Sequence, residues 1–194
     1  MARGKEQELD LEHLRETAGL AAICRNRPAA SNGVCYGGVA VVWRTGACLF
    51  REVPIKNPDG FEILVGAGSI KGHLRRLVVL ACYLPPNYDR ERGCRAADFV
   101  VDLIIRMKRR FKVPYIVTAG DFNQWELDLA DLADMEEVPV GLTRGSRSID
   151  KIFTNVPRKV VEAGTLTPLE TEEDQSSDHR TAFCTMMLPR QEVF

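Results

Sequence analysis

The chain has 194 residues, of which 45% are hydrophobic, and a formal net charge of −1 at pH 7. This length and composition fit one globular domain with its own core, and the near-zero charge gives no compositional sign of nucleic-acid binding. No run of 18 apolar residues and no leader pattern occurs, so we expect an intracellular protein, nuclear or cytoplasmic, without a membrane partner. The six cysteines lack C-x-x-C spacing, which favours reduced packing residues over zinc ligands or disulfides.

The N-terminal part, residues 1–34, is expected to be a polar segment that precedes a folded domain over residues 35–190. Charged side chains dominate residues 1–17, which favours a solvated helix or a frayed terminus over a buried strand. Apolar runs bounded by Gly, Pro and Asn predict strands farther along the chain. These strands cover residues 39–43, 48–53, 61–65, 77–83, 115–119, 149–154, 159–163 and 181–188.

A long helix over residues 96–111 is predicted before the strand at 115–119. Phe99, Leu103, Met107 and Phe111 repeat at four-residue spacing, which is typical of a stripe that faces the core. We expect the basic residues around this stripe to form its solvated side. Many strands and few helices, in mixed order, predict an α/β fold: a four-layer α/β sandwich of two packed mixed sheets with outer helices.

A polar motif, Gly120-Asp121-Phe122-Asn123, follows the predicted strand at 115–119. If the strand continues, Asp121 and Asn123 share one face and Phe122 points to the other. A carboxylate and a carboxamide in one pocket suit the hydrolysis of a phosphate ester with a divalent cation. The alternative is an Asx-rich turn leading into a helix suggested over residues 125–133.

A second motif, Ser177-Asp178-His179, precedes the last predicted strand. Adjacent residues of a strand point to opposite faces, so Asp178 is not expected to orient the His179 ring. Asp150, in another strand, is the natural carboxylate partner for His179. Such a pair makes imidazole a useful base or transition-state stabiliser near neutral pH. The alternative reading of this motif is a solvated strand start.

Together with Tyr83-Leu84-Pro85-Pro86, these ordered motifs resemble the endonuclease/exonuclease/phosphatase superfamily. The resemblance covers residues 35–188. The stretch from Leu142-Thr143-Arg144 to Asp150 and the glycine-led strand that begins at Gly37 are most similar to the endonucleases of non-long-terminal-repeat retrotransposons.

The resemblance implies a role for each motif residue. In this family the residue matching Asp121 orients the attacking water, and the residue matching Asn123 contacts the scissile phosphate. The residue matching Asp150 orients the histidine that matches His179, which stabilises the transition state or transfers a proton. Asp178 is then expected near the metal.

Three further residues are expected close to the phosphate. Tyr83 matches the family's aromatic residue before the paired prolines, and the resemblance places it among the catalytic residues. Arg144 and Arg147 flank Gly145 in a loop before Asp150, which makes them candidates for phosphate contact.

Family members normally begin with an Asn-bearing strand and a second strand that ends in a Glu metal ligand. The residues before Gly37 are too few and too polar to supply both strands, so we expect a domain that is incomplete at its N-terminus. Glu16-Thr17 matches the family's Glu-Thr pair in letters alone. Glu16 is therefore a weaker candidate metal ligand than Asp178.

The leading hypothesis is a phosphodiesterase, a DNA endonuclease that uses Mg²⁺ or Mn²⁺, is monomeric and descends from a retrotransposon. A reverse transcriptase domain would be its partner in the parent element. Two alternatives stay open: a catalytically inactive remnant of the fold, and a phosphatase that acts on small phosphoesters.

Overall fold

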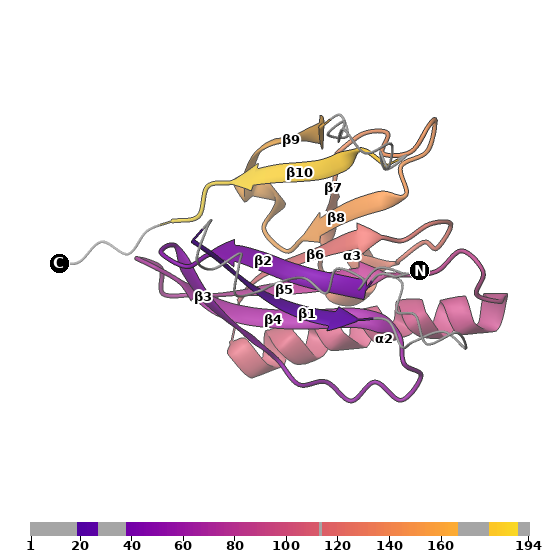
Figure 1. The fold of residues 1–194 in the computed structure, drawn as a ribbon, viewed down its shortest axis with the longest axis horizontal. Helices are drawn as coiled ribbons and strands as arrows, with labels where there is room; N and C mark the ends of the chain where they lie inside the picture. Colours follow the sequence, from indigo (N-terminus) through magenta and orange to yellow (C-terminus); the bar gives the residue numbers. More distant parts are fainter. Residues whose placement is uncertain (1–18, 27–37, 113, 167–178, 190–194) are drawn as a thin grey trace, which may run out of the picture.

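The computed structural model describes residues 19–26, 38–112, 114–166 and 179–189. In this part of the chain six strands form one mixed sheet in the order β3-β4-β5-β6-β8-β7 (Figure 1). β5 and β6 run parallel, and the other neighbours run antiparallel. The strands are β3 (Cys48–Glu52), β4 (Glu62–Ile70), β5 (Arg76–Tyr83), β6 (Tyr115–Asp121), β7 (Glu136–Val138) and β8 (Asp150–Thr154).

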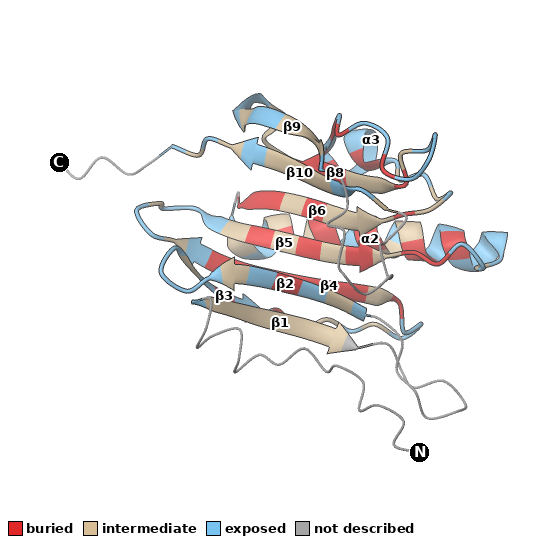
Figure 2. Ribbon diagram, turned by 45° about the horizontal axis from the view of Figure 1, so that its top comes forward, coloured by how far each residue is buried: buried red, intermediate tan, exposed pale blue. Residues whose placement is uncertain are grey.

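One side of this sheet, which we call the helix face, is covered by α2 (Arg90–Phe111) and by the short α3 (Leu129–Ala133). The α2 stripe predicted from the sequence lies in the main core: Leu103 and Met107 are buried, and Phe99 and Phe111 pack against them. They meet the β4 and β5 side chains Ile63, Val65, Val78 and Leu80, which are 0% exposed. This apolar layer shows as the red bands of β5 and α2 in Figure 2.

The opposite side, the hairpin face, is covered by two separate two-stranded sheets. The first pairs β1 (Leu20–Asn26) with β2 (Gly38–Arg44), and the second pairs β9 (Val160–Leu166) with β10 (Thr181–Met186); a 3-10 turn, η1 (Pro157–Lys159), precedes β9. The β9–β10 hairpin packs on β6, β7 and β8 over a smaller core centred on Val138, Val140 and Ile152. The first hairpin lies over β4, where its Ile23 contacts Gly66.

The α/β class with mixed sheets and few helices is confirmed. In the described ranges the second strand layer is two hairpins instead of one continuous sheet, and both helices lie on the helix face. All eight predicted strands are present, with end points that differ by up to five residues. The sequence missed β1, which lies inside the expected polar segment 1–34, and the three-residue β7.

The helices differ from expectation at their starts. α2 begins at Arg90, because the side chain of Asp89 accepts a hydrogen bond from the Arg92 amide and caps the helix. Its first three residues are charged and exposed, so no apolar periodicity in the sequence reveals where the helix starts. The helix suggested over residues 125–133 is confined to α3, and residues 125–128 before it have no regular secondary structure.

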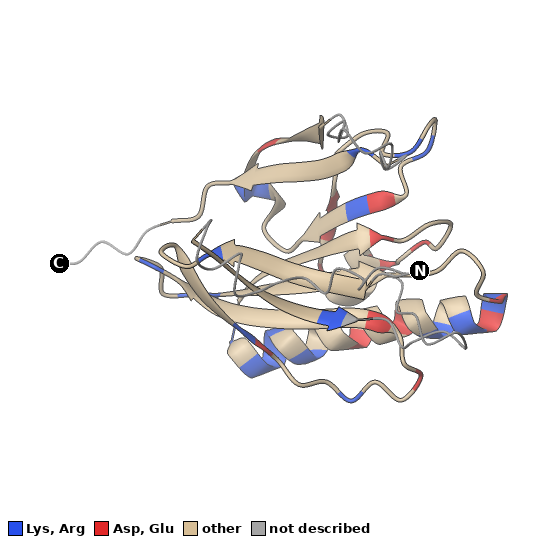
Figure 3. Ribbon diagram, viewed as in Figure 1, with Lys and Arg blue, Asp and Glu red and all other residues tan. Residues whose placement is uncertain are grey.

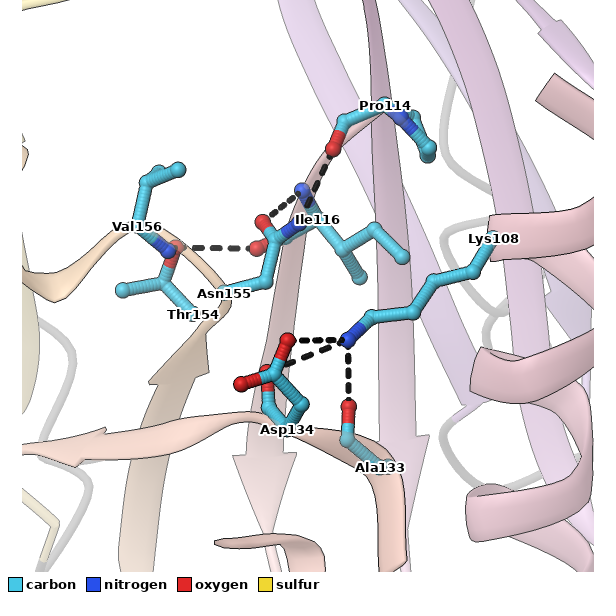
Figure 4. A network of polar contacts seen from close by, with 8 residues as sticks. All are labelled: Lys108, Pro114, Ile116, Ala133, Asp134, Thr154, Asn155 and Val156. Atoms are coloured by element: carbon cyan, nitrogen blue, oxygen red, sulfur yellow. Dashed lines mark hydrogen bonds and ion pairs between the residues drawn. The ribbon is translucent and has the colours of Figure 1, made fainter. Parts of the chain in front are cut away.

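Lys108 departs from the prediction that the basic residues of α2 are solvated. Its ammonium group donates to the backbone oxygen of Ala133 at 2.6 Å and pairs with the Asp134 carboxylate at 3.1 Å (Figure 4). Its side chain is 24% exposed. Lys108 therefore satisfies carbonyl groups at the C-terminal end of α3, where a cation is favoured.

Asn155 fixes β8 against β6 (Figure 4), and it does so at the end of the two strands opposite to Asp121 and Asp150. Its side-chain oxygen accepts from the Ile116 amide at 2.8 Å, and its side-chain nitrogen donates to the Pro114 carbonyl at 2.9 Å. The Thr154 hydroxyl adds a bond to the Ile116 carbonyl at 2.9 Å. These bonds hold the register that decides which residues meet at the other end of the two strands.

The five cysteines in the described ranges are all free; Cys82 is buried and three are half-buried, but Cys94 is exposed and is therefore not a packing residue. Complete burial raises the pKa of the Cys82 thiol to about 12, so this group is an inert part of the core. No helix in these ranges is long and apolar enough to cross a membrane.

Candidate active site

A row of polar side chains crosses three strands at one end of the sheet. In the strand register Tyr83 of β5 lies opposite Asp121 of β6, and Asp121 lies opposite Asp150 of β8. Val117 and Ala119 alternate with Asp121 and pack on the hairpin face, so the Asp121 carboxylate faces the same side. Ile152, two residues after Asp150 in β8, also packs on the hairpin face, so the Asp150 carboxylate faces this side as well. Figure 3 shows the acidic ends of β6 and β8 side by side.

The structure brings His179 to Asp150, the partner expected from the sequence, although His179 lies in a bend before β10 and not in a strand. Nδ1 of His179 lies 2.9 Å from an Asp150 carboxylate oxygen, and the two side chains are 24% and 21% exposed. An ionised carboxylate only accepts hydrogen bonds, so this contact places the ring proton on Nδ1. Nε2 of the neutral ring is then the atom that can accept a proton.

Asp121, Asp150 and His179 form a compact cluster, in which one potential ligand atom from each lies within 4.8 Å of the others. Burial raises the pKa of Asp121, and the negative charge of Asp150 raises it further, while the Asn123 amide and His179 act in the opposite direction. Two carboxylates and an imidazole are a donor set that suits a divalent cation such as Mn²⁺ or Mg²⁺. The cluster is therefore a possible acidic metal site.

Asn123 does not continue the strand, which corrects the alternation argument for this residue. β6 ends at Asp121, and Asn123 has a left-handed backbone with φ of 50°. Its amide donates to the Asp121 carboxylate at 2.9 Å, and its side chain donates to the Leu84 carbonyl at 3.0 Å. The motif is thus an Asx-type turn, and this turn itself holds both side chains at the site.

Gly120 allows the backbone at the end of β6 to lie close to β5. A Cβ atom at this position would overlap the carbonyl oxygen of Cys82. Phe122 anchors the other side of the turn: it is fully buried, it stacks edge-on with Phe153, and its amide donates to the Ile149 carbonyl at 2.8 Å. The turn that holds Asp121 and Asn123 is therefore anchored in the core by Phe122.

A pocket of about 880 Å³ adjoins this turn. Asn123 lines it together with Arg144 and Arg147, so the structure joins the three residues predicted to bind phosphate. The arginines bracket a tight turn in which each backbone amide donates to the other's carbonyl, and Gly145 takes a left-handed φ of 55°. Two guanidinium groups and an amide favour an anionic ligand. The remaining lining residues are Pro86, Gln124, Gly145, Ser146 and Ile149.

Two predicted metal ligands, Glu16 and Asp178, lie outside the described residues. Sequence reasoning missed Gln124, which lines the pocket and donates to the Pro86 carbonyl at 2.7 Å. Its position directly after the Gly-Asp-Phe-Asn motif could have indicated that Gln124 lies at the site. It also gave Thr143 no role, although this buried residue bonds to the backbone of Asp150.

The fold is shared with several solved structures. The mannosyl-6-phosphatase of Bacteroides thetaiotaomicron is 17% identical with a TM-score of 0.65, over 92% of this chain and 81% of that one. TDP2 of D. rerio, solved with a single-strand DNA product, is 13% identical with a TM-score of 0.62, over 91% and 81%. The catalytic domain of human Nocturnin is 14% identical with a TM-score of 0.58, over 89% and 76%.

No curated protein matches the chain in sequence. The profile of the Endonuclease/Exonuclease/phosphatase family matches residues 7–179, which is most of the chain and spans every motif of the candidate site. The chain therefore belongs to the Endonuclease/Exonuclease/phosphatase family.

Proposed function

We propose that this protein is a divalent-metal-dependent phosphodiesterase that cleaves DNA. The observation that carries the proposal is the hydrogen-bonded Asp150–His179 pair beside Asp121, next to a pocket lined by two arginines. A carboxylate-oriented imidazole can move a proton, and a cationic pocket can hold a phosphodiester in place. Hydrolysis of a phosphate ester needs both elements.

Each residue of the site has a distinct task. Arg144 and Arg147 hold the phosphate oxygens, and Asn123 positions the scissile phosphate. Asp121 orients the attacking water through its carboxylate. Asp150 keeps the His179 proton on Nδ1, so Nε2 faces the reaction as a neutral acceptor that stabilises the transition state once protonated.

A divalent cation, Mg²⁺ or Mn²⁺, would supply charge neutralisation at the phosphoryl oxygens. Asp121 and Asp150 are the described carboxylates that could hold it. Asp178 and Glu16 are the further ligands proposed from the sequence. Because Asp150 also bonds His179, only its second oxygen is available for this purpose.

DNA is the proposed substrate for two reasons. The pocket is open and flanked by an arginine-bearing loop, which suits a polyanion better than an enclosed site would. The DNA-bound TDP2 structure supports the same substrate by analogy of fold. Descent from a retrotransposon endonuclease, with a reverse transcriptase as partner, remains the origin proposed from the motif at residues 142–150.

The second candidate is a phosphatase acting on small phosphoesters. The similarity in fold to a mannosyl-6-phosphatase favours it, and the Asp–His pair would serve that reaction equally well. A sugar phosphate is small enough to enter a pocket of about 880 Å³. The two candidates differ in substrate and not in the catalytic residues.

Nicking of supercoiled plasmid DNA in Mg²⁺ or Mn²⁺, with and without EDTA, tests the proposal. We expect metal-dependent nicking that falls about 100-fold or more in Asp150→Asn. Asp98→Asn, at an exposed position of α2, is the matched control and should nick as the wild type does. Phosphate release from sugar or inositol phosphates without nicking would favour the phosphatase. Absence of both activities would favour an inactive remnant of the fold.

A further inference from the structure

Thr143 connects the two segments that carry the Asp–His pair. Its side chain is fully buried, and its hydroxyl oxygen accepts hydrogen bonds from the amides of Ile149 at 3.1 Å and Asp150 at 3.0 Å. Its carbonyl accepts the amide of Arg180, the residue after His179, at 2.6 Å. One residue is therefore bonded on one side to β8 and on the other to the segment that leads into β10.

The Thr143 hydroxyl differs from those of the other buried threonines in the hydrogen bonds that it makes. Three threonines in the described ranges are 0% exposed: Thr118, Thr143 and Thr154. The Thr118 hydroxyl has no hydrogen-bond partner there, and the Thr154 hydroxyl bonds backbone near the opposite end of β6. Only the Thr143 hydroxyl accepts two amides beside the candidate site, which matches the two lone pairs that a hydroxyl offers.

We propose that Thr143 is a positioning residue that holds Asp150 and His179 at hydrogen-bonding distance. The two side chains come from positions 29 residues apart, and a side-chain contact at 2.9 Å does not by itself fix the two backbones. An error of about 1 Å between reacting groups can cost about 100-fold in rate. Thr143 constrains both backbones, because its hydroxyl bonds the Asp150 amide and its carbonyl bonds the amide of Arg180, next to His179.

The Thr143 hydroxyl is not needed to hold the arginine loop. That loop is closed by backbone bonds: the amides of Thr143 and Arg144 donate to the Arg147 carbonyl, and the Arg147 amide donates back to Arg144. A valine at position 143 keeps all of these bonds and the side-chain volume, and removes only the two-amide acceptor. It should therefore disturb the Asp–His pair and leave the phosphate pocket intact.

The first test is the imidazole NMR spectrum of ¹⁵N-histidine-labelled protein, which requires no activity. We expect Thr143→Val to lose or shift the hydrogen-bonded Nδ1–H signal of His179. Thr143→Ser retains the acceptor oxygen and should preserve that signal. Thr118→Val, the matched control, should also preserve it. A wild-type His179 spectrum in Thr143→Val would refute the proposal, even if that variant melted at a lower temperature.

A measurement on the wild type covers the case in which Thr143→Val does not fold. The amides of Ile149 and Asp150 should exchange with deuterium at least about 10-fold more slowly, relative to their intrinsic rates, than the exposed amide of Ser146. Exchange of all three at equal relative rates would overturn the proposed bonds.

The kinetic consequence rests on the proposed function and is tested separately. In an active preparation, Thr143→Val should lower kcat about 10-fold or more with KM unchanged, and Thr143→Ser should restore most of kcat. A raised KM with unchanged kcat would contradict the positioning role and indicate damage to the loop. If the wild type is inactive, the imidazole spectrum still decides the positioning role, and only the proposed function fails.

Discussion

The two faces of the six-stranded sheet serve different purposes. The helix face buries a continuous apolar layer formed by side chains of β4, β5 and α2. The hairpin face under β9 and β10 has a smaller buried core, Val138, Val140 and Ile152, and the side chains packed against it, such as Val117, Ala163 and Ala182, are half-buried. Asp121, Asp150 and Tyr83 lie on this second face.

This difference shows how stability and chemistry can be separated within one sheet. Strand alternation sends successive residues to opposite faces, so one strand can contribute both to the core and to the site. Ionisable groups are tolerated on the hairpin face because it keeps partial contact with water. The helix face should accordingly control unfolding, and the hairpin face should control activity.

The largest effect is expected on the helix face. Leu103→Asp places a carboxylate among fully buried side chains and should cost at least about 4 kcal/mol, enough to unfold a marginally stable domain. Circular dichroism and thermal melting measure this effect. Arg109→Ala, on the exposed side of the same helix, is the control and should leave the melting temperature within about 1 °C. A larger loss in Arg109→Ala would mean that the buried face of α2 is wrongly assigned.

Adjacent valines of β5 compare the two faces directly. Val78 points to the helix face and is 0% exposed, whereas Val79 points to the hairpin face and is half-buried. Val78→Ala should cost about 2 kcal/mol and Val79→Ala less than about 1 kcal/mol, because less apolar area is lost and less of a cavity remains. Urea unfolding of both variants measures the two losses of unfolding free energy. Equal costs would show that the hairpin face is packed as tightly as the helix face.

His179→Ala should affect activity far more than stability. The ring is half-buried and hydrogen-bonds the Asp150 carboxylate, so the unfolding free energy should fall by no more than about 1 kcal/mol. Nicking or phosphate release should fall about 100-fold or more. His73→Ala removes the other described imidazole, in the turn after β4, and should retain activity. Normal turnover in His179→Ala would remove this residue from the mechanism.

Asp121→Asn should give the smallest change in stability, in the stabilising direction. Burial raises the pKa of Asp121, so the native state favours the neutral carboxyl and loses stability as pH rises through that raised pKa. Asn resembles the neutral form. Its advantage should therefore be absent near pH 3 and grow toward pH 7, to no more than about 3 °C because the group is half-exposed and screened.

Thermal melts of Asp121→Asn and wild type across this pH range make the comparison, with Asp98→Asn as the control for loss of one exposed negative charge. The same variant should lose activity despite its higher stability, as expected for a residue that serves chemistry at the expense of the fold. A stabilisation that is constant with pH would mean that the charge of Asp121 is not its cause.

The sequence alone determined which residues form most of the strands and the α2 stripe, because alternation and four-residue spacing are local properties. It also indicated Asp150 as the partner of His179, but the alternation argument used for that choice does not apply, because His179 lies before β10. The motifs and their order along the chain were enough to indicate the family. Each of these inferences depends on residues close in the chain or on one rule of strand geometry.

Only the tertiary structure decided the features that depend on distant contacts. The small, alanine-rich β1 is a strand because β2 pairs with it, and Lys108 is half-buried because the end of α3 lies beside it. Asn123 leaves the strand because its side chain bonds Leu84, which is 39 residues away. The row of Tyr83, Asp121 and Asp150 arises from the register of three strands, and hydrogen bonds between distant segments fix that register, so no local pattern in the sequence contains it.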